Sequence, residues 1–162
     1  MKYRHIKPSD DGQIAKIIRN NLKANHLDIP GTVYFDSNLD NISDFYLSDP
    51  AKRDYYIWTD DEGTVIGGIG LAEFEGFDEC SELQKLYLTD EAKGDHLGYD
   101  MIRLIEERAV ELGYRQMYLE THTNLTAAIH IYEKCGYREI SKPESVVHGG
   151  MNRFYIKELG IL

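Results

Sequence analysis

The residues that could carry chemistry in this sequence gather between positions 80 and 137. Residues 80–88 read as a strand and residues 98–112 as an amphipathic helix, and a glycine-containing loop at 93–98 joins them. A loop that presents backbone N–H groups at a helix N-terminus is suited to binding phosphate groups. Tyr132 follows on the next predicted helix, where its phenol could face the same cleft as a proton donor. The segment therefore predicts a phosphate-bearing cofactor held beside a proton donor.

Hydrophobic periodicity and turn residues divide the rest of the chain into short elements that would position this segment. Residues 55–59 and 65–72 form a predicted antiparallel hairpin, with Gly63 as the left-handed residue of its turn. Three glycines in the second of these strands indicate a bulge, or a close approach by a ligand or a neighbouring chain. The expected elements are, in chain order, strand 3–6, a helix with N-cap candidates at 9–11, a short helix at 41–47, strands 55–59, 65–72 and 80–88, helix 98–112, strand 116–120, a helix ending before Gly136, and two final strands.

This order combines local hairpins with helical crossovers, which predicts an α/β fold, an α+β hybrid with a mixed sheet and helices on both faces. We expect one domain over residues 1–162, because no linker or low-complexity segment divides the chain. Ser9 to Asp11 supply helix N-cap candidates, with Gln13 in a capping-box position three residues after Asp10. The irregular stretch at 24–50 is a candidate wall of the substrate site.

The composition restricts the partners. The net charge is −10, from 28 acidic and 18 basic residues, so most of the surface would repel nucleic acid and attract cations. The sequence has no apolar run that could span a bilayer, and we expect no membrane partner. Cys80 and Cys135 form no close metal-ligand pair and the six histidines form no metal constellation, so we predict no metal. We expect reduced cysteines and a cytoplasmic location, with a homodimer as an open alternative to a monomer.

Three segments in this order resemble the core of the GNAT acetyltransferase superfamily. Their order, spacing and flanking elements are similar to those of the family over roughly residues 65–137, and only the element order is similar elsewhere. The resemblance implies a mostly antiparallel sheet with one splayed strand pair, acetyl-CoA as co-substrate, and transfer to an amine of a small molecule or peptide. The three segments are Ser81-Glu82-Leu83-Gln84-Lys85-Leu86-Tyr87-Leu88, Lys93-Gly94-Asp95-His96-Leu97-Gly98 and Ile131-Tyr132-Glu133-Lys134-Cys135-Gly136-Tyr137.

The family's pyrophosphate loop reads Arg/Gln-x-x-Gly-x-Gly/Ala, and this sequence departs from it at two signature positions. Lys93 takes the first position and keeps a positive charge, whereas His96 replaces the inner glycine. If that position needs positive φ, a β-carbon costs about 1 kcal/mol or more. Asp95 also places a negative charge beside the expected anion. The resemblance implies cofactor contacts at Leu86, Leu88, Lys93, Gly94, Asp95, His96, Leu97, Gly98 and Tyr99.

The resemblance also implies two catalytic residues. An amine must lose a proton before it attacks a thioester, and a carboxylate can accept that proton directly or through a water. Glu82 holds the corresponding position on its strand, with Glu73, Glu75 and Glu120 as other carboxylates that could serve. Tyr132 matches the family's general acid, which protonates or hydrogen-bonds the departing thiolate.

Leu86 and Leu88 are expected to act through backbone groups that pair with pantetheine amides, much as an added strand would. Leu125 replaces an asparagine common in the family, and Asn124 is expected to cap the following helix. The resulting prediction is an acetyl-CoA-dependent N-acetyltransferase that works by direct transfer in a ternary complex. Two alternatives stay open: a CoA-binding or sensory module without catalysis, motivated by the altered loop, and an interaction domain whose acidic face binds a basic partner.

Overall fold

The computed structural model describes residues 1–94, 96–146 and 149–160. Its helices and strands follow the predicted order, with bounds that differ by a few residues at most elements. The strands are β1 (Lys2–His5), β2 (Asp54–Thr59), β3 (Val65–Phe74), β4 (Cys80–Leu88), β5 (Gln116–Thr121), β6 (Arg138–Ile140) and β7 (Arg153–Glu158). The α-helices are α1 (Asp11–Ala24), α2 (Ile42–Leu47), α3 (Leu97–Glu111) and α4 (Thr126–Lys134).

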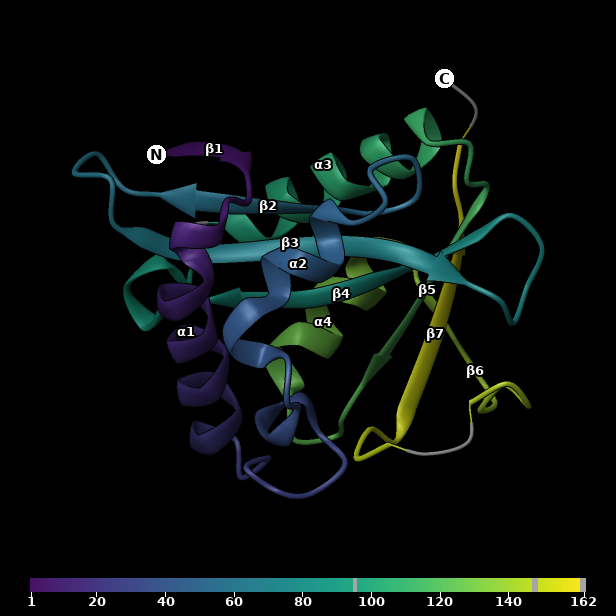
Figure 1. The fold of residues 1–162 in the computed structure, drawn as a ribbon. Coiled ribbons are helices and arrows are strands. Elements are labelled where there is room, and N and C mark those ends of the chain that lie inside the picture. Colours follow the sequence, from purple (N-terminus) through teal and green to yellow (C-terminus); the bar gives the residue numbers. More distant parts are fainter. Residues whose placement is uncertain (95, 147–148, 161–162) are drawn as a thin grey trace.

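The seven strands form one sheet in the order β1-β2-β3-β4-β5-β7-β6. Every neighbouring pair is antiparallel except β4 and β5, which run parallel. That parallel ladder joins only Cys80–Glu82 to residues 116–118, after which the two strands diverge (Figure 1). The sheet is therefore opened along part of its centre, at the carboxyl end of β4.

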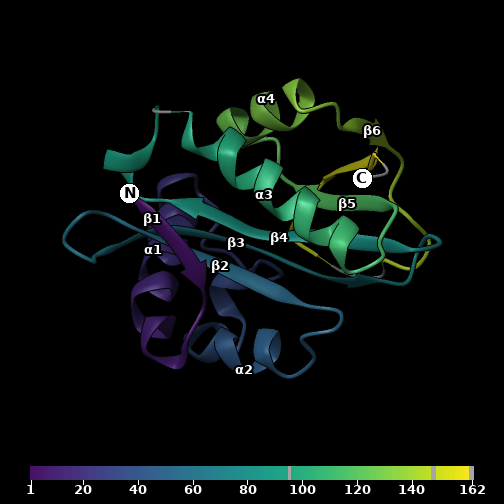
Figure 2. The ribbon, with the colours of Figure 1, turned by 90° about the horizontal axis from the view of Figure 1, so that it is seen from above.

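Helices cover both faces of the sheet, as predicted. Figure 2 shows α1 and α2 on one side and α3 and α4 on the other. The face under α1 buries Ile14, Ile18 and Leu22, which follow one another at helical spacing. The opposite face buries Met101, Ile105 and further α3 residues against β3, β4 and β5. The predicted α/β hybrid with a mixed sheet is confirmed.

The glycines of β3 accompany a bulge, which was one of the two predicted explanations for them. The β3–β4 register shifts between Gly68 and Gly70, and opposite this shift Lys85 has a left-handed backbone with φ of 52°. A β-carbon on Gly68 or on Gly70 would lie 2.4 Å from the ring of Tyr55. The group that approaches these glycines is therefore the Tyr55 side chain of β2, rather than a ligand or another chain. The Tyr55 hydroxyl donates to the Lys85 carbonyl at 2.8 Å.

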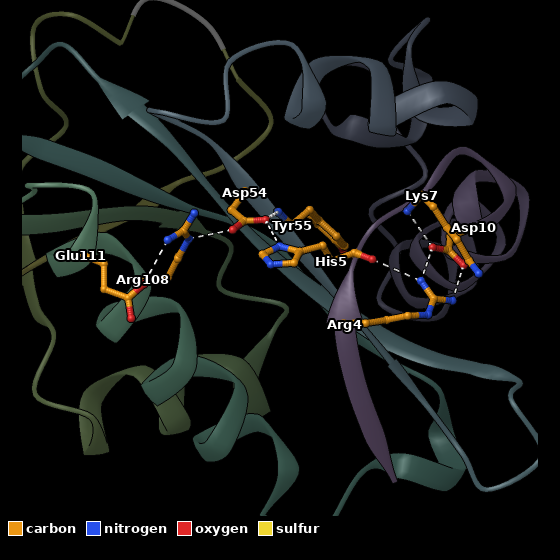
Figure 3. A network of polar contacts seen from close by, with 8 residues as sticks. All are labelled: Arg4, His5, Lys7, Asp10, Asp54, Tyr55, Arg108 and Glu111. Atoms are coloured by element: carbon orange, nitrogen blue, oxygen red, sulfur yellow. Dashed lines mark hydrogen bonds and ion pairs between the residues drawn. The ribbon is translucent and has the colours of Figure 1, made fainter.

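A polar network ties the edge of the sheet to α3 (Figure 3). The Asp54 carboxylate contacts His5 Nδ1 and Arg108 Nε, each at 2.8 Å. Nearby, Asp10 accepts from Nη1 and Nη2 of Arg4 and from the backbone N–H of Lys7. These bonds join β1, β2 and α3, and they fix the start of α1.

The capping box predicted with Gln13 is wrong. Asp10 is the N-cap residue of α1, but its carboxylate accepts from the N–H of Lys7 and so caps the preceding 3-10 turn. Gln13 turns away and its Oε1 accepts from the N–H of Val65 at 3.4 Å. A local sequence pattern could not foresee that β3 would compete for this amide.

Candidate active site

A cavity of about 440 Å³ lies where β4 and β5 diverge. Its walls are the carboxyl half of β4, the loop before α3, the first turn of α3, the end of β5 and one face of α4. The structure brings together on these walls all the predicted cofactor residues that it describes: Leu86, Leu88, Lys93, Gly94, His96, Leu97, Gly98 and Tyr99. Asp95 lies outside the described residues. Their contacts with a cofactor stay a prediction.

Two residues of the loop before α3 have a left-handed backbone, and one of them, His96, is at the inner signature position for which the sequence raised this possibility. Gly94 has φ of 94° and His96, the N-cap residue of α3, has φ of 58°. The first N–H groups of a helix lack partners within the helix and carry the positive end of its dipole. The loop and the first turn of α3 therefore present a site that favours an anion, on the cavity wall.

Two polar groups beside the cavity bear on whether a pantetheine-like ligand fits. Thr121 Oγ1 is buried at the end of β5 and finds no hydrogen-bond partner among the described residues, as a wall built to meet a ligand amide would leave it. The Leu88 carbonyl accepts from Asn21 Nδ2 at 2.9 Å, so a ligand would share this oxygen through its second lone pair. The residues present are compatible with the group that the resemblance implies.

Glu82 is the last β4 residue of the parallel ladder, so it lies where the strands begin to part. Its carboxylate accepts from Gln84 Nε2 at 2.9 Å. Burial raises the pKa of the Glu82 carboxyl to about 7, and the negative charge of Glu120 adds to the rise. The Gln84 hydrogen bond and the charge of Lys85 oppose it. A carboxylate with this pKa can gain and lose a proton near neutral pH.

The other carboxylates lie in different surroundings. Glu120 lines the cavity, and its Oε2 accepts from the Tyr118 hydroxyl at 2.9 Å. Burial raises the pKa of the Glu120 carboxyl. Glu82 lies beside the cavity wall rather than on it, in the part of the chain that the structure describes. Glu73 is paired with Arg53, which holds the pKa of its carboxyl below the usual value, so it is poorly suited to act as a base.

Tyr132 comes to the cavity from α4. The residue is 6% exposed, and its hydroxyl makes no hydrogen bond to the residues that the structure describes. Burial raises the pKa of the Tyr132 phenol far above its ordinary value, and the neighbouring Tyr87 adds to the rise. The phenol therefore keeps its proton at every physiological pH and can act as a donor.

Two side chains near Glu82, those of Gln84 and Tyr46, were not predicted from the sequence as functional. Gln84 follows Glu82 by two residues, so strand alternation could have placed both on one face. Tyr46, which bonds Gln84, comes from α2 and leaves no such local signal.

The cap prediction for Asn124 is wrong, because Leu125 is the N-cap of α4 and Asn124 Nδ2 donates to the Asn25 carbonyl instead.

In the described residues, no cluster of three or more histidine, cysteine, aspartate or glutamate side chains could hold a metal ion. Within the same residues, no helix combines the length and the apolar character that crossing a membrane requires.

Comparison with solved structures shows the same fold. A GNAT-family acetyltransferase from Staphylococcus aureus Mu50 superposes with a TM-score of 0.85 at 21% identity, over 98% of this chain and 99% of that one. YncA, a putative acetyltransferase from Salmonella typhimurium solved with its cofactor acetyl-CoA, superposes with a TM-score of 0.74 at 18% identity, over 99% and 94% of the two chains. At these identities the likeness establishes the architecture.

Sequence comparison shows the family to which the chain belongs. The chain is 33% identical over 139 residues to the uncharacterized N-acetyltransferase YjgM of Escherichia coli (strain K12), over 85% of this chain and 81% of that protein. The family model described as the acetyltransferase (GNAT) family matches residues 19–137. The match spans most of the chain and includes the loop, Glu82 and Tyr132, so the chain belongs to the GNAT acetyltransferase family.

Proposed function

We propose that this protein transfers the acetyl group of acetyl-CoA to a primary amine by direct attack in a ternary complex. The observation that carries the proposal is the place of Glu82 where β4 and β5 part, in surroundings whose burial raises the pKa of its carboxyl to about 7. A general base works best when its pKa lies near the working pH, because both protonation states are then accessible. The buried phenol of Tyr132 on the cavity wall supports the same assignment.

Glu82 takes the proton of the acceptor ammonium, which leaves the nitrogen lone pair free to attack. The new N–C bond forms and the C–S bond breaks, and Tyr132 gives its proton to the departing sulfur. The ionised Glu82 and the protonated Tyr132 coexist near neutral pH, because burial raises the pKa of the phenol far above that of the carboxyl. The nitrogen loses its second proton after the N–C bond has formed, and this proton restores the Tyr132 phenol. Glu82 returns the first proton to solvent, so one proton is released in each reaction.

The co-substrate would supply an activated acyl group as a thioester. We assign its diphosphate to the loop residues Lys93, Gly94 and His96 and to the first turn of α3, where Leu97 and Gly98 lie on the cavity wall. Leu86 and Leu88 would border its pantetheine arm. Tyr99, on the same wall, would lie beside the loop end of this path.

The acceptor would approach from the side of α1 and α2, because Glu82 shares a β4 face with Gln84, which is bonded to Tyr46 of α2. We propose a small-molecule or peptide amine as the acceptor class. The negative net charge would attract such cations and disfavour nucleic acid.

A second function, CoA binding without turnover, is favoured by one observation. His96 holds a left-handed backbone that a side chain disfavours, at a position where the family has glycine. Calorimetric titration with acetyl-CoA, paired with a thiol-release assay across small amines, polyamines, amino acids and N-terminal peptides, separates the two functions. Binding with release above the acetyl-CoA-only background supports the transferase. Binding without release from any amine supports the module, and absence of binding contradicts both.

A further inference from the structure

A chain of hydrogen bonds runs from α2 to the carboxylate of Glu82. The Tyr46 hydroxyl donates to Gln84 Oε1 at 2.7 Å, and Gln84 Nε2 donates to Glu82 Oε1 at 2.9 Å. Glu82 and Gln84 lie two residues apart on β4, so both side chains stand on the same face of the sheet. The chain thus links a buried phenol to the candidate base through one amide.

The first member of this chain is held rigidly. Tyr46 is 2% exposed, and its ring packs against Phe45 and Tyr55, with centroids 5.0 Å away in each case. A β-carbon on Gly70 would lie 3.1 Å from Tyr46 Cε1, so the ring depends on a glycine in β3 for its place. Burial raises the pKa of the Tyr46 phenol well above its ordinary value, so it remains a proton donor.

The polarity of the chain favours one protonation state of Glu82. Because the Tyr46 hydroxyl donates to the carbonyl oxygen of Gln84, the amide N–H₂ of Gln84 is turned toward Glu82. An ionised carboxylate accepts a stronger, charge-assisted hydrogen bond from that group than a protonated carboxyl does. Tyr46 therefore fixes the amide in the orientation that stabilises the charged base.

We propose that Gln84, held by Tyr46, is a positioning residue that orients the Glu82 carboxylate and keeps it ionised for proton transfer. This inference rests on the proposed role of Glu82 as the base. Other charged and titratable groups face Glu82 from three elements: Lys85 and Cys80 of β4, Glu120 and Tyr118 of β5, and Tyr46 of α2. The positive charge of Lys85 favours the ionised form of Glu82, and the negative charge of Glu120 disfavours it. The amide of Gln84 carries no charge but also favours the ionised form, through its hydrogen bond.

The test is a direct titration of Glu82, which needs no acceptor. Protein labelled with ¹³C at the glutamate carboxyl carbons is titrated by NMR, and Glu82→Gln identifies the signal. Gln84→Met keeps the length of the side chain and removes the donor, so the Glu82 midpoint should rise by on the order of one pH unit. Tyr46→Phe should raise it by less. The double variant should match Gln84→Met, because Tyr46 acts only through Gln84.

The matched control is Tyr137→Phe, which removes another buried tyrosine hydroxyl that donates to a different carboxylate, that of Glu106 at 2.8 Å. It should leave the Glu82 midpoint unchanged. A folded Gln84→Met whose midpoint stays or falls would overturn the proposal. If Gln84→Met does not fold, the proposal is overturned by a Tyr46→Phe protein in which the Glu82 midpoint is the same as in wild type. Failure of the proposed function is seen separately, as wild-type protein that releases no thiol with any amine.

Thiol release with an amine that the wild-type protein accepts gives the second readout. The acidic limb of kcat/KM should move to higher pH in Gln84→Met, with about fivefold loss at pH 7, about tenfold loss in more acidic solution, and recovery at alkaline pH. A merely structural defect would lower the rate equally at every pH, and that result would contradict the positioning role.

Discussion

At the scale of single residues, the phenol of Tyr132 is the group whose role is easiest to isolate, because its hydroxyl bonds none of the described residues. Tyr132→Phe keeps the ring in the core and removes only the proton donor. We expect kcat to fall about 10²- to 10⁴-fold, as for loss of a general acid, while the Kd of acetyl-CoA changes little. Stopped-flow or steady-state thiol release measures the first and calorimetry the second. Unchanged turnover would leave Tyr132 as a packing residue.

If Glu82 is the base, as proposed, its ionised form serves catalysis but lowers the stability of the fold. Its folded pKa of about 7 lies above its unfolded value, so its favourable contribution is complete at low pH and is lost as pH rises through 7. Glutamine stays uncharged at every pH, so Glu82→Gln avoids this loss of stability. We expect the variant to be more stable than wild type at pH 8, by on the order of 3 kcal/mol at most, and inactive in transfer.

Denaturant unfolding at pH 5 and pH 8 measures that difference. Glu62→Gln, a change in the exposed turn between β2 and β3, is the control and should alter neither stability nor rate. A Glu82→Gln protein that is less stable than wild type at pH 8 would show that ionised Glu82 is a net stabilising group.

His96 is a test of the loop at the same scale. Its φ of 58° disfavours a β-carbon, and glycine at this position should relax the backbone and let a diphosphate come closer. We expect His96→Gly to bind CoA about fivefold more tightly, which corresponds to about 1 kcal/mol. Calorimetry with CoA and with pantetheine reads this out. Weaker binding of CoA alone would identify the imidazole as a phosphate ligand, and no change with either compound would place the diphosphate elsewhere.

At the scale of elements, what the sequence could predict depended on whether the determining contacts were local. The order of strands and helices follows from periodicity and from Gly113 and Gly136, both of which have positive φ at helix ends. The bulge at Lys85 was foreseen only as a consequence of glycines in β3. Asp10 is the N-cap of α1, as the sequence suggested, but the capping box with Gln13 and the cap at Asn124 are wrong. The side chains of Gln13 and Asn124 share one reason: each bonds a backbone group far away in the sequence, at Val65 and at Asn25.

In the candidate site too, local features could be predicted from the sequence and contacts between distant residues could not. The loop and Tyr132 lie in short motifs and could be read from the sequence, whereas the link between Tyr46 and Gln84 spans 38 positions. Its formation depends on how α2 packs on the sheet, which no local pattern encodes. The pKa of Glu82 likewise depends on burial by elements that are distant in the sequence.

The contact between β2 and β3 gives a prediction at this scale. Gly68→Ala would place a β-carbon 2.4 Å from the fully buried ring of Tyr55, whose hydroxyl holds the bulge at Lys85. We expect a loss of about 1–3 kcal/mol in the free energy of unfolding from overpacking, with reduced acetyl transfer. Gly12→Ala is the matched control: nothing lies within 4 Å of its β-carbon position in α1, so the change should stabilise by up to about 1 kcal/mol. Equal effects of the two substitutions would contradict this packing argument.

At the scale of the whole molecule, the cavity joins groups from both layers of helices and from the split in the sheet. Its walls include Asn21 of α1, Gly98 of α3 and Tyr132 of α4, in addition to β4 and β5. A ligand that fills it would contact elements on both sides of the sheet, so its binding energy would stabilise the entire fold rather than one segment.

Acetyl-CoA should therefore raise the melting temperature of the protein. A ligand that binds only the folded state adds about 2.7 kcal/mol at a hundredfold excess over Kd, which for a domain of this size corresponds to an increase of roughly 5–11 °C. Differential scanning fluorimetry with acetyl-CoA, CoA and pantetheine measures the effect, and pantetheine should give the smallest increase because it lacks the diphosphate that α3 would bind. Tyr132→Phe should show the same increase as wild type, since in the proposed mechanism the phenol acts on the leaving sulfur and not on binding. An absence of any increase at millimolar CoA would count against the acetyl-CoA-dependent function, because a filled cavity between the two helical layers cannot leave stability unchanged.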